Sequence, residues 1–350
     1  MKADTLSLAL GLGEPMVGRD LSKGQFAGSG LGGGVFTQCT LIEADFRGAD
    51  LRESVFDQCT LTGAMFAGAN LRRAVFNRCL LTHADFREAN LHAAVLSESD
   101  LSHAQCASAW LGMATISASK LDHASFAGAK LDSTIFSGSS LLDVNADDSQ
   151  WRHTHVTECN VTQLTWARAT MTRTVFHKTS LQKKVFTGLV LDGCQFAFCD
   201  LSGADFRQIS MRQCNFQGAK LAGADFSKTQ ASNSIFCECE GESARFVGAH
   251  LQQALFTKAS LPGARFDKAN LMQCHFAEAQ LSGGSFEGAD LSYADFSGAD
   301  LQRANFPGAT LFRTRLHRAN TQDAHLPDQA RALQTDPDLA EAQDWRPRAL

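Results

Sequence analysis

The amino-acid sequence predicts a single all-β solenoid, because one short unit repeats along almost the whole chain without losing phase. Residues 289–308 are four copies of this unit: a small residue, Asp or Asn, Leu or Phe, and two variable polar positions. The large apolar residue, the centre of the unit, recurs every five residues from Leu21 to Leu316, 60 times in all. Of the 30 centres whose numbers end in 1, 24 are Leu; of the 30 ending in 6, 23 are Phe, out of 25 Phe in the chain. So long and strict a repeat decides the fold class.

The consensus of the unit, small-[Asp/Asn]-[Leu/Phe]-x-x, resembles that of the pentapeptide-repeat proteins over about 85% of the chain. The resemblance implies a right-handed, quadrilateral parallel β-helix in which four units form one coil. It implies less about activity, because the family includes DNA-mimicking inhibitors of topoisomerases as well as secretion-linked proteins, and a fold does not carry a function.

The period of five independently favours this geometry. It fits neither an α-helix nor a flat strand, so each unit should contribute one short side and a corner. With four units in a coil, residues 20 apart stack at the strand spacing of about 4.8 Å, and Phe46, Phe66 and Phe86 then form one inward stack. The centres and the small residues two positions before them should face inward. Sixty units predict about 15 coils and a rod of about 70 Å.

Composition limits the remaining possibilities. The chain has 350 residues, 37 of them acidic and 32 basic, with a formal net charge of −5. No hydrophobic run approaches the length of a membrane span. The first residues contain one Lys beside an acid rather than the basic start of a signal peptide. We therefore expect a cytoplasmic protein that does not bind a membrane.

The 11 cysteines are expected to be reduced and structural. Nine of them occupy the small inward position, where Cys alternates with Ala, Ser and Thr. Parallel side chains stacked at about 4.8 Å point their sulfurs the same way, whereas a disulfide needs Cβ atoms about 3.8 Å apart. Cys237 and Cys239 have no second pair at zinc-ligand spacing, so they do not indicate a metal site.

Residues 1–20 precede the repeat and are expected to cap the first coil. Leucines alternate with small residues from Leu6 to Leu12, which is typical of a strand. An uncovered end of a β-helix exposes unpaired backbone groups that would recruit another chain. The alternative is that this segment is an arm that pairs with a partner.

Residues 21–316 form the predicted solenoid, and residues 317–350 form a helical cap or tail. Pro327 and Pro337 each begin a predicted short helix, the second with Asp336 as its N-cap. The apolar residues of the tail are expected to cover the last coil, although the same residues would also serve a dimer contact. They are Leu326, Leu333, Leu339 and Trp345.

In the segment 139–190 the phase survives but the residues fit poorly. Lys184 occupies a small inward position, which is costly unless its ammonium escapes to water. Trp151 and Trp166 replace Leu and Phe as centres. We expect these coils to swell, bend or extrude a loop. The two Trp are also candidate partner-binding residues, since Trp is enriched in interface hot spots; the alternative is that they fill a widened core.

No pattern in the sequence indicates catalysis. There is no hydrolase elbow, phosphate-binding loop or dinucleotide fingerprint, and the Asp of each unit suits a turn because its side chain can bond nearby backbone. His83, His103 and His123 share an outward position on successive coils and could share a metal. Nothing acidic or thiol-bearing completes such a site, so solvated stacked histidines are expected. We predict no catalytic residue, cofactor or metal.

A basic strip is the first candidate partner surface. Arg52, Arg72 and His92 lie 20 residues apart, and Arg73 lies beside them. The strip could hold an acidic partner, whereas a merely solvated face is the alternative. These residues, like the two Trp of the irregular coils, are candidates for contact with another protein.

The other candidate is acidic and belongs to the alternative function, a DNA-mimicking inhibitor of a topoisomerase such as gyrase. Asp290, Asp295 and Asp300 lie in a stretch without Lys or Arg. Matching the charge density of duplex DNA would need roughly three net negative charges per coil, far more than −5 overall. The sequence therefore favours a non-enzymatic rigid scaffold or adaptor that binds another protein and not nucleic acid directly. A monomer is expected, with a dimer through one end as the alternative.

Overall fold

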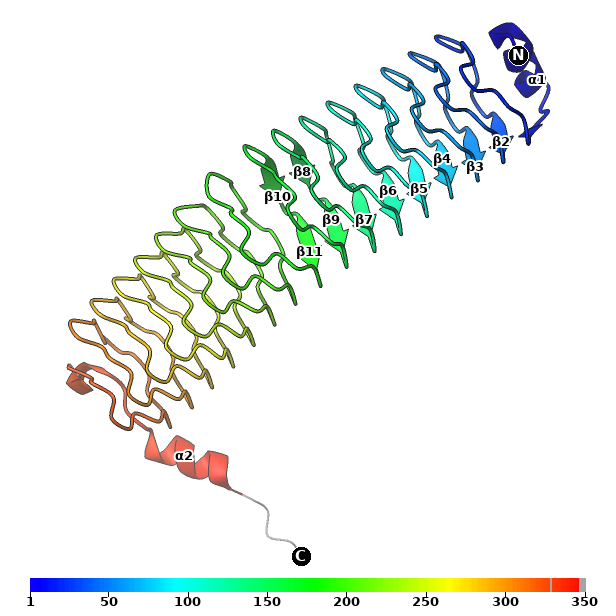
Figure 1. Ribbon diagram of the computed structural model, residues 1–350. Helices are drawn as coiled ribbons and strands as arrows, with labels where there is room; N and C mark the ends of the chain where they lie inside the picture. Colours follow the sequence, from blue (N-terminus) through cyan, green and yellow to red (C-terminus); the bar gives the residue numbers. More distant parts are fainter. Residues whose placement is uncertain (328, 346–350) are drawn as a thin grey trace, which may run out of the picture. The chain divides into compact units, whose positions relative to one another are not determined.

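The computed structural model describes residues 1–327 and 329–345, which form two compact units, Met1–Ser180 and Leu181–Leu350. Within each unit, residues 20 apart in number lie on neighbouring coils and pair in parallel (Figure 1). The predicted kind of fold, a parallel β-solenoid, is confirmed. The boundary between the units falls inside the segment 139–190, where the sequence fits the repeat worst.

The first unit contains the regular strands. One parallel sheet stacks nine of them in the order β1-β2-β3-β4-β5-β6-β7-β9-β11, and a second sheet pairs β8 with β10. The nine-stranded ladder has fewer layers than the roughly 15 coils predicted, because it ends at residue 177 and the coils of the second unit pair through single bridges. The strands are β1 (Met16–Val17), β2 (Val35–Thr37), β3 (Val55–Asp57), β4 (Val75–Asn77), β5 (Val95–Ser97), β6 (Thr115–Ser117), β7 (Ile135–Ser137), β8 (Gln150–Arg152), β9 (His155–Thr157), β10 (Thr170–Thr172) and β11 (Val175–His177).

The second unit keeps the same spacing through single bridges, from the pair Val185 and Asp205 to the pair Asn305 and His325. The coil conformation therefore extends past residue 316, where the predicted solenoid ended. In the first unit the spacing also holds through the irregular segment, since Asn160 pairs with Ser180. The described residues between 139 and 180 thus extrude no loop.

The core of each unit consists of stacked centres, as predicted. Phe66 is fully buried, and its ring lies 5.1 Å from that of Phe46 and 4.9 Å from that of Phe86, nearly parallel to both. Rings on adjacent sides of a coil meet edge to face, as Phe56 and Phe66 do at 6.3 Å and 78°. Both arrangements are favourable for aromatic pairs. The Phe stacks therefore fill the interior with the same contacts coil after coil.

Each corner of a coil depends on a left-handed residue, which the sequence analysis did not predict. All 20 glycines with positive φ have numbers ending in 3 or 8, the second variable position of the unit. Larger residues adopt the same conformation there, for example Met113 and Tyr293, both with φ of 61°. Glycine is favoured at such positions because it has no Cβ to clash. The enrichment of Gly at one of the two variable positions was therefore the available sequence signal for the corner.

The Asp of the unit stabilises the turn, as predicted. Asp45 Oδ1 accepts a hydrogen bond from the backbone N–H of Arg47 at 3.1 Å, and Asp225 Oδ1 accepts one from Ser227 at 2.9 Å. An Asx turn of this kind satisfies a backbone donor beside the corner. These carboxylates are structural acceptors.

The N-terminal segment is a helix, α1 (Ala3–Gly11), so the predicted strand is wrong. Leu6 and Leu10 are buried, and they lie on one helical face because residues four apart stack along a helix. Leu10 packs so closely over Gly34 that a Cβ there would lie 2.8 Å from Leu10 Cδ1. Ser7 Oγ donates a hydrogen bond to the carbonyl of Gly30 at 2.7 Å. A helix satisfies its own backbone groups while its apolar face lies against the coil, which a single strand would not do.

The C-terminal tail contains the short 3-10 helix η1 (Gln329–Arg331) and the helix α2 (Pro337–Asp344). Asp336 caps α2 by accepting the backbone N–H of Leu339 at 3.0 Å, as predicted. Leu333 pairs with the last coil, donating its N–H to Thr314 at 2.7 Å and accepting from Leu316 at 2.8 Å. Backbone pairing by this segment, rather than helical side chains, therefore covers part of the last coil.

The apolar residues of α2 do not cover the last coil, contrary to the expectation. Leu339 is 43% exposed and Trp345 is 73% exposed, and α2 has no buried residue. Among residues 1–327 and 329–345, no helix is both long and apolar enough to cross a lipid bilayer.

Candidate functional site

The basic strip exists as a column on the first unit but carries less free charge than predicted. Glu53 and Arg72 lie on neighbouring coils, with the N–H of Glu53 donating to the carbonyl of Arg72 at 2.9 Å. Arg52 is paired with Asp50 at 2.6 Å, and Arg73 with Glu53 at 3.3 Å. Within the described chain Arg72 makes no ion pair. The strip therefore offers one free guanidinium and two that are neutralised locally.

The fourth member of the strip, His92, supports an exposed indole. Its ring packs against that of Trp110 with centroids 4.7 Å apart. The indole lies over Gly112, where a Cβ would be 2.6 Å from Trp110 Nε1. A side chain at Gly112 would thus displace Trp110. These contacts hold the ring in place while it remains 44% exposed, so Trp110 presents an ordered indole to solvent.

Three further apolar residues are exposed at the corner that follows Trp110 and on the next side of the coils. Val95 and Ile135 lie in one column on either side of Thr115, and are 36% and 41% exposed. Met113, two residues before Thr115, is 61% exposed. We refer to Val95, Trp110, Met113 and Ile135 as the Trp110 patch. An aromatic anchor beside other exposed apolar side chains is typical of a protein-binding surface.

The sequence analysis missed this patch because all four residues occupy outward positions, which the repeat does not constrain. A usable signal was present: four large apolar side chains stand at outward positions between Val95 and Ile135, a span of only about two coils. The fixed 20-residue spacing aligns Val95 with Ile135 and leaves Trp110 on the preceding side of the coils.

Trp151 and Trp166, predicted as candidate contact residues, are buried with exposures of 1% and 5%. Trp151 Nε1 donates a hydrogen bond to Ser149 Oγ at 2.6 Å, which satisfies its only polar group. The alternative prediction, that large side chains fill a widened core, agrees with the structure. Neither indole is exposed to a partner.

The histidine column is present as predicted. The rings of His83 and His103 stack at 4.8 Å and 7°, and those of His103 and His123 stack at 4.9 Å and 9°. His123 Nδ1 lies 3.0 Å from a carboxylate oxygen of Asp143. Parallel rings do not converge on one point, and the described residues include no group of three or more His, Cys, Asp or Glu arranged to hold a metal ion.

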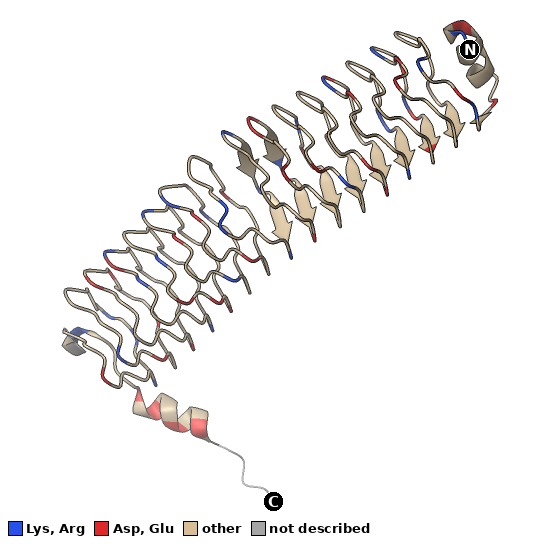
Figure 2. Cartoon of the chain, viewed as in Figure 1, with Lys and Arg blue, Asp and Glu red and all other residues tan. Residues whose placement is uncertain are grey.

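The acidic candidates do not form one surface. Because four units make a coil, residues five apart lie on successive sides, so Asp290, Asp295 and Asp300 face different directions. Their Oδ1 atoms accept backbone N–H groups two residues on, and Asp295 also faces Arg315 at 3.5 Å. Figure 2 shows acidic and basic residues interspersed along the coils of each unit. These three aspartates therefore do not form the acidic stripe that DNA mimicry requires.

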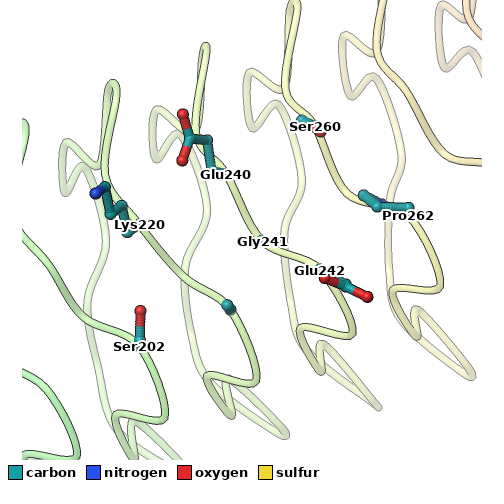
Figure 3. A pocket seen from close by; sticks show the side chains of 8 residues that line it. Ser202, Lys220, Glu240, Gly241, Glu242, Ser260 and Pro262 are labelled. Carbon is teal, nitrogen blue, oxygen red and sulfur yellow. The ribbon is translucent and has the colours of Figure 1, made fainter.

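A shallow pocket of about 320 Å³ on the second unit lacks the features of an active site (Figure 3). Gly241 replaces a Leu centre at its floor, where a Cβ would lie 2.7 Å from Leu261 Cδ2. Its polar side chains, including Lys220 and Glu240, come from successive coils and do not gather at one point. The pocket contains no nucleophile oriented by a base.

All 11 cysteines are free thiols, as predicted, and all but Cys237 are buried. Burial raises the pKa of Cys106 to about 12 and that of Cys274 also to about 12. Thiols that remain protonated at neutral pH are poor nucleophiles. These cysteines are small apolar fillers of the core.

Comparison with known proteins agrees with the coil geometry. A family model described as a pentapeptide repeat region matches residues 34–106, 190–266, 209–283 and 249–326, and one described as pentapeptide repeats (8 copies) matches residues 99–138 and 169–208. The chain belongs to the pentapeptide-repeat family. Solenoids of the pentapeptide-repeat family are generally not enzymes.

Two solved structures illustrate the likeness. HetL, a pentapeptide-repeat protein involved in heterocyst differentiation regulation from the cyanobacterium Nostoc sp. strain PCC 7120, is 26% identical, over 80% of this chain and 90% of its own, with a TM-score of 0.26. QnrB1, a plasmid-mediated fluoroquinolone resistance protein, is 19% identical, over 67% of this chain and 97% of its own, with a TM-score of 0.25. No curated protein matches the chain.

Proposed function

We propose that this pentapeptide-repeat protein is a non-enzymatic interaction scaffold that binds another protein through the Trp110 patch. The observation that carries the proposal is a fixed yet exposed indole, held by His92 over Gly112. Met113 is exposed at the following corner, and Val95 and Ile135 are exposed on the next side of the coils. Aromatic side chains that are ordered before binding lose little conformational entropy on contact. A cytoplasmic location is part of the proposal and is supported by the free thiols.

The chemistry around the patch favours a protein partner over nucleic acid. Phosphate recognition requires several converging cations. Here Arg52 and Arg73 are already paired with carboxylates. Lys130, one coil after Trp110, and Arg72, one coil before His92, make no ion pair among the described residues. The surface therefore suits a partner with apolar side chains and a few carboxylates.

The test is site-specific photo-crosslinking in the native cell. A photoreactive amino acid at Met113 should give a discrete protein adduct, identified by mass spectrometry, and the adduct should decrease at least tenfold with Trp110→Ala. The same probe at Thr62, an outward position away from the patch, is the matched control. Equal adducts at both positions, or an adduct unaffected by Trp110→Ala, would reject the Trp110 patch as the binding surface.

A further inference from the structure

The helix α2 and the residue after it leave large apolar side chains exposed to solvent. Polar contacts hold it to the last coils of the second unit: Arg318 pairs with Asp344 at 2.5 Å, and His317 bonds to Gln343 at 3.0 Å. No residue of α2 is buried, and Leu339 and Trp345 remain exposed. An exposed Leu on this short helix and an exposed Trp directly after its last residue form a surface suited to a partner.

The charge of α2 is of one sign. Residues 337–344 contain Asp338, Glu341 and Asp344 and no Lys or Arg, as Figure 2 shows. Asp344 pairs with Arg318, whereas Asp338 and Glu341 make no ion pair among the described residues. These two carboxyl-bearing residues line the same shallow hollow as Trp345. The exposed indole that follows the helix therefore lies beside two carboxyl-bearing side chains.

The Trp110 patch is complementary to this surface. Lys130 pairs along the solenoid with Trp110 and so lies on the neighbouring coil at the same outward position. Neither Lys130 nor Arg72 makes an ion pair within the described residues, while the nearby acid Asp132 faces Arg152 at 3.9 Å. An apolar patch with free cations thus matches a helix with exposed apolar residues and free carboxylates.

We infer that α2 of one copy docks onto the Trp110 patch of a second copy of this chain. This inference rests on the proposed role of the patch as a protein-binding surface. The two contacting surfaces differ, so the contact is heterologous, and each copy keeps one free patch and one free helix for further copies. The contact is small, since one two-turn helix covers less than a standard interface, and the association is reversible and weakened by salt.

The experiment measures self-association of the full chain by sedimentation equilibrium across protein concentration. The mean mass should rise with concentration and continue beyond a dimer. Trp345→Ala and Trp110→Ala should each weaken association tenfold or more, because a buried Trp dominates small interfaces. A chain that stays monomeric up to about 1 mM, a concentration at which even a very weak contact is populated, would overturn the inference.

A charge exchange supplies the specific control. Lys130→Glu and Glu341→Lys should each weaken association about threefold to fivefold, the range of an exposed ion pair, and a chain carrying both changes should recover. Lys228→Glu, the same charge change at an exposed site of the second unit, should have no effect. Failure of the double variant to recover would show that the two sites do not contact each other.

Two other outcomes separate the hypotheses. A dimer that depends on α2 but not on Trp110 would show that α2 pairs with itself, and would overturn the docking inference. If self-association is absent while the Met113 probe still captures a Trp110-dependent partner in cells, the proposed function stands and only the identity of the partner is wrong. If the chain does not self-associate and the Met113 probe gives no Trp110-dependent adduct, the Trp110 patch is not a binding surface.

Discussion

At the scale of single residues, the fold depends on a left-handed corner in every unit. Gly68 has φ of 65°, and a Cβ built there would meet no atom within 4 Å. Any cost of substituting Gly68 therefore comes from backbone conformation and not from a steric clash with neighbours. A substitution at Gly68 therefore measures what the corner conformation contributes to stability, without a change in side-chain packing.

We expect Gly68→Val to destabilise the protein by about 1–2 kcal/mol, the cost of holding an L-residue in the left-handed region. The adjacent change Ala67→Val, made outside the corner position, should alter the free energy of unfolding by less than about 0.5 kcal/mol. Urea unfolding of the two variants is the measurement. A larger effect at residue 67 than at residue 68 would contradict the role of the corner.

A second effect at this scale concerns Asp45, which is almost fully buried. Its carboxylate accepts hydrogen bonds from Nε and Nη2 of Arg47, at 2.9 and 2.7 Å. The hydrogen bonds from Arg47 lower the pKa of Asp45 below its ordinary value. Because the pKa in the folded state is the lower one, the pair stabilises the fold above the unfolded pKa of about 4 and loses this effect as pH falls through the folded pKa.

Asp45→Asn should therefore cost about 1 kcal/mol at pH 7, since the exposed Arg47 is partly screened by water. The difference between variant and wild type should shrink below about pH 4. Thermal unfolding at pH 7 and at pH 3 measures it. A constant difference at the two pH values would show that the charge of Asp45 is not responsible.

At the scale of the elements, the repeat predicted the stacked core well and the rest less well, for physical reasons. The centres could be assigned because Phe and Leu recur in phase 60 times. The helix α1 could not be distinguished from a strand, because four Leu over seven residues satisfy both periods. Trp110 could not be assigned a role from its own unit, because outward positions carry no constraint until the register places them side by side.

Packing of the Phe stack should dominate stability. Phe66→Ala removes a fully buried ring that contacts two stacked and two edge-on neighbours, and should cost about 3–5 kcal/mol. Asp57→Ala changes an outward residue that accepts a hydrogen bond from Asn77, and should cost less than about 0.5 kcal/mol. Similar melting shifts for the two variants would contradict a core of inward stacks.

At the scale of the whole molecule, the first coil and the last coil are covered in different ways. α1 buries Leu6 and Leu10 against the first coils, whereas at the other end the segment around Leu333 adds backbone pairing to the last coil. The sequence predicted a cap at each end but not its form. The apolar residues of α2 remain available for another contact, so covering the end and binding a partner are separable functions of the tail.

Two truncations test this separation. A chain that ends after Thr335 keeps the pairing of Leu333 and loses only α2, and it should stay folded and soluble with reduced self-association. A chain that ends after Asn320 also loses Leu333 and the coil residues up to His325, and it should aggregate because the last coil is left open. Light scattering and mass measurements compare them. A soluble, folded chain after truncation at Asn320 would show that the last coil needs no cover.

The 20-residue length of one coil determines which side chains stack in the core and which align on the outward faces. This length is therefore the property to test most directly. Deleting residues 201–220 removes one coil from the second unit and restores the phase, since repeat proteins tolerate loss of whole repeats. Deleting residues 201–218 breaks the phase by two residues. Thermal unfolding followed by circular dichroism should show one cooperative transition within about 5 °C of the full chain for the first deletion, and a lower or broader transition for the second. Equal unfolding of the two deletions would contradict the 20-residue coil.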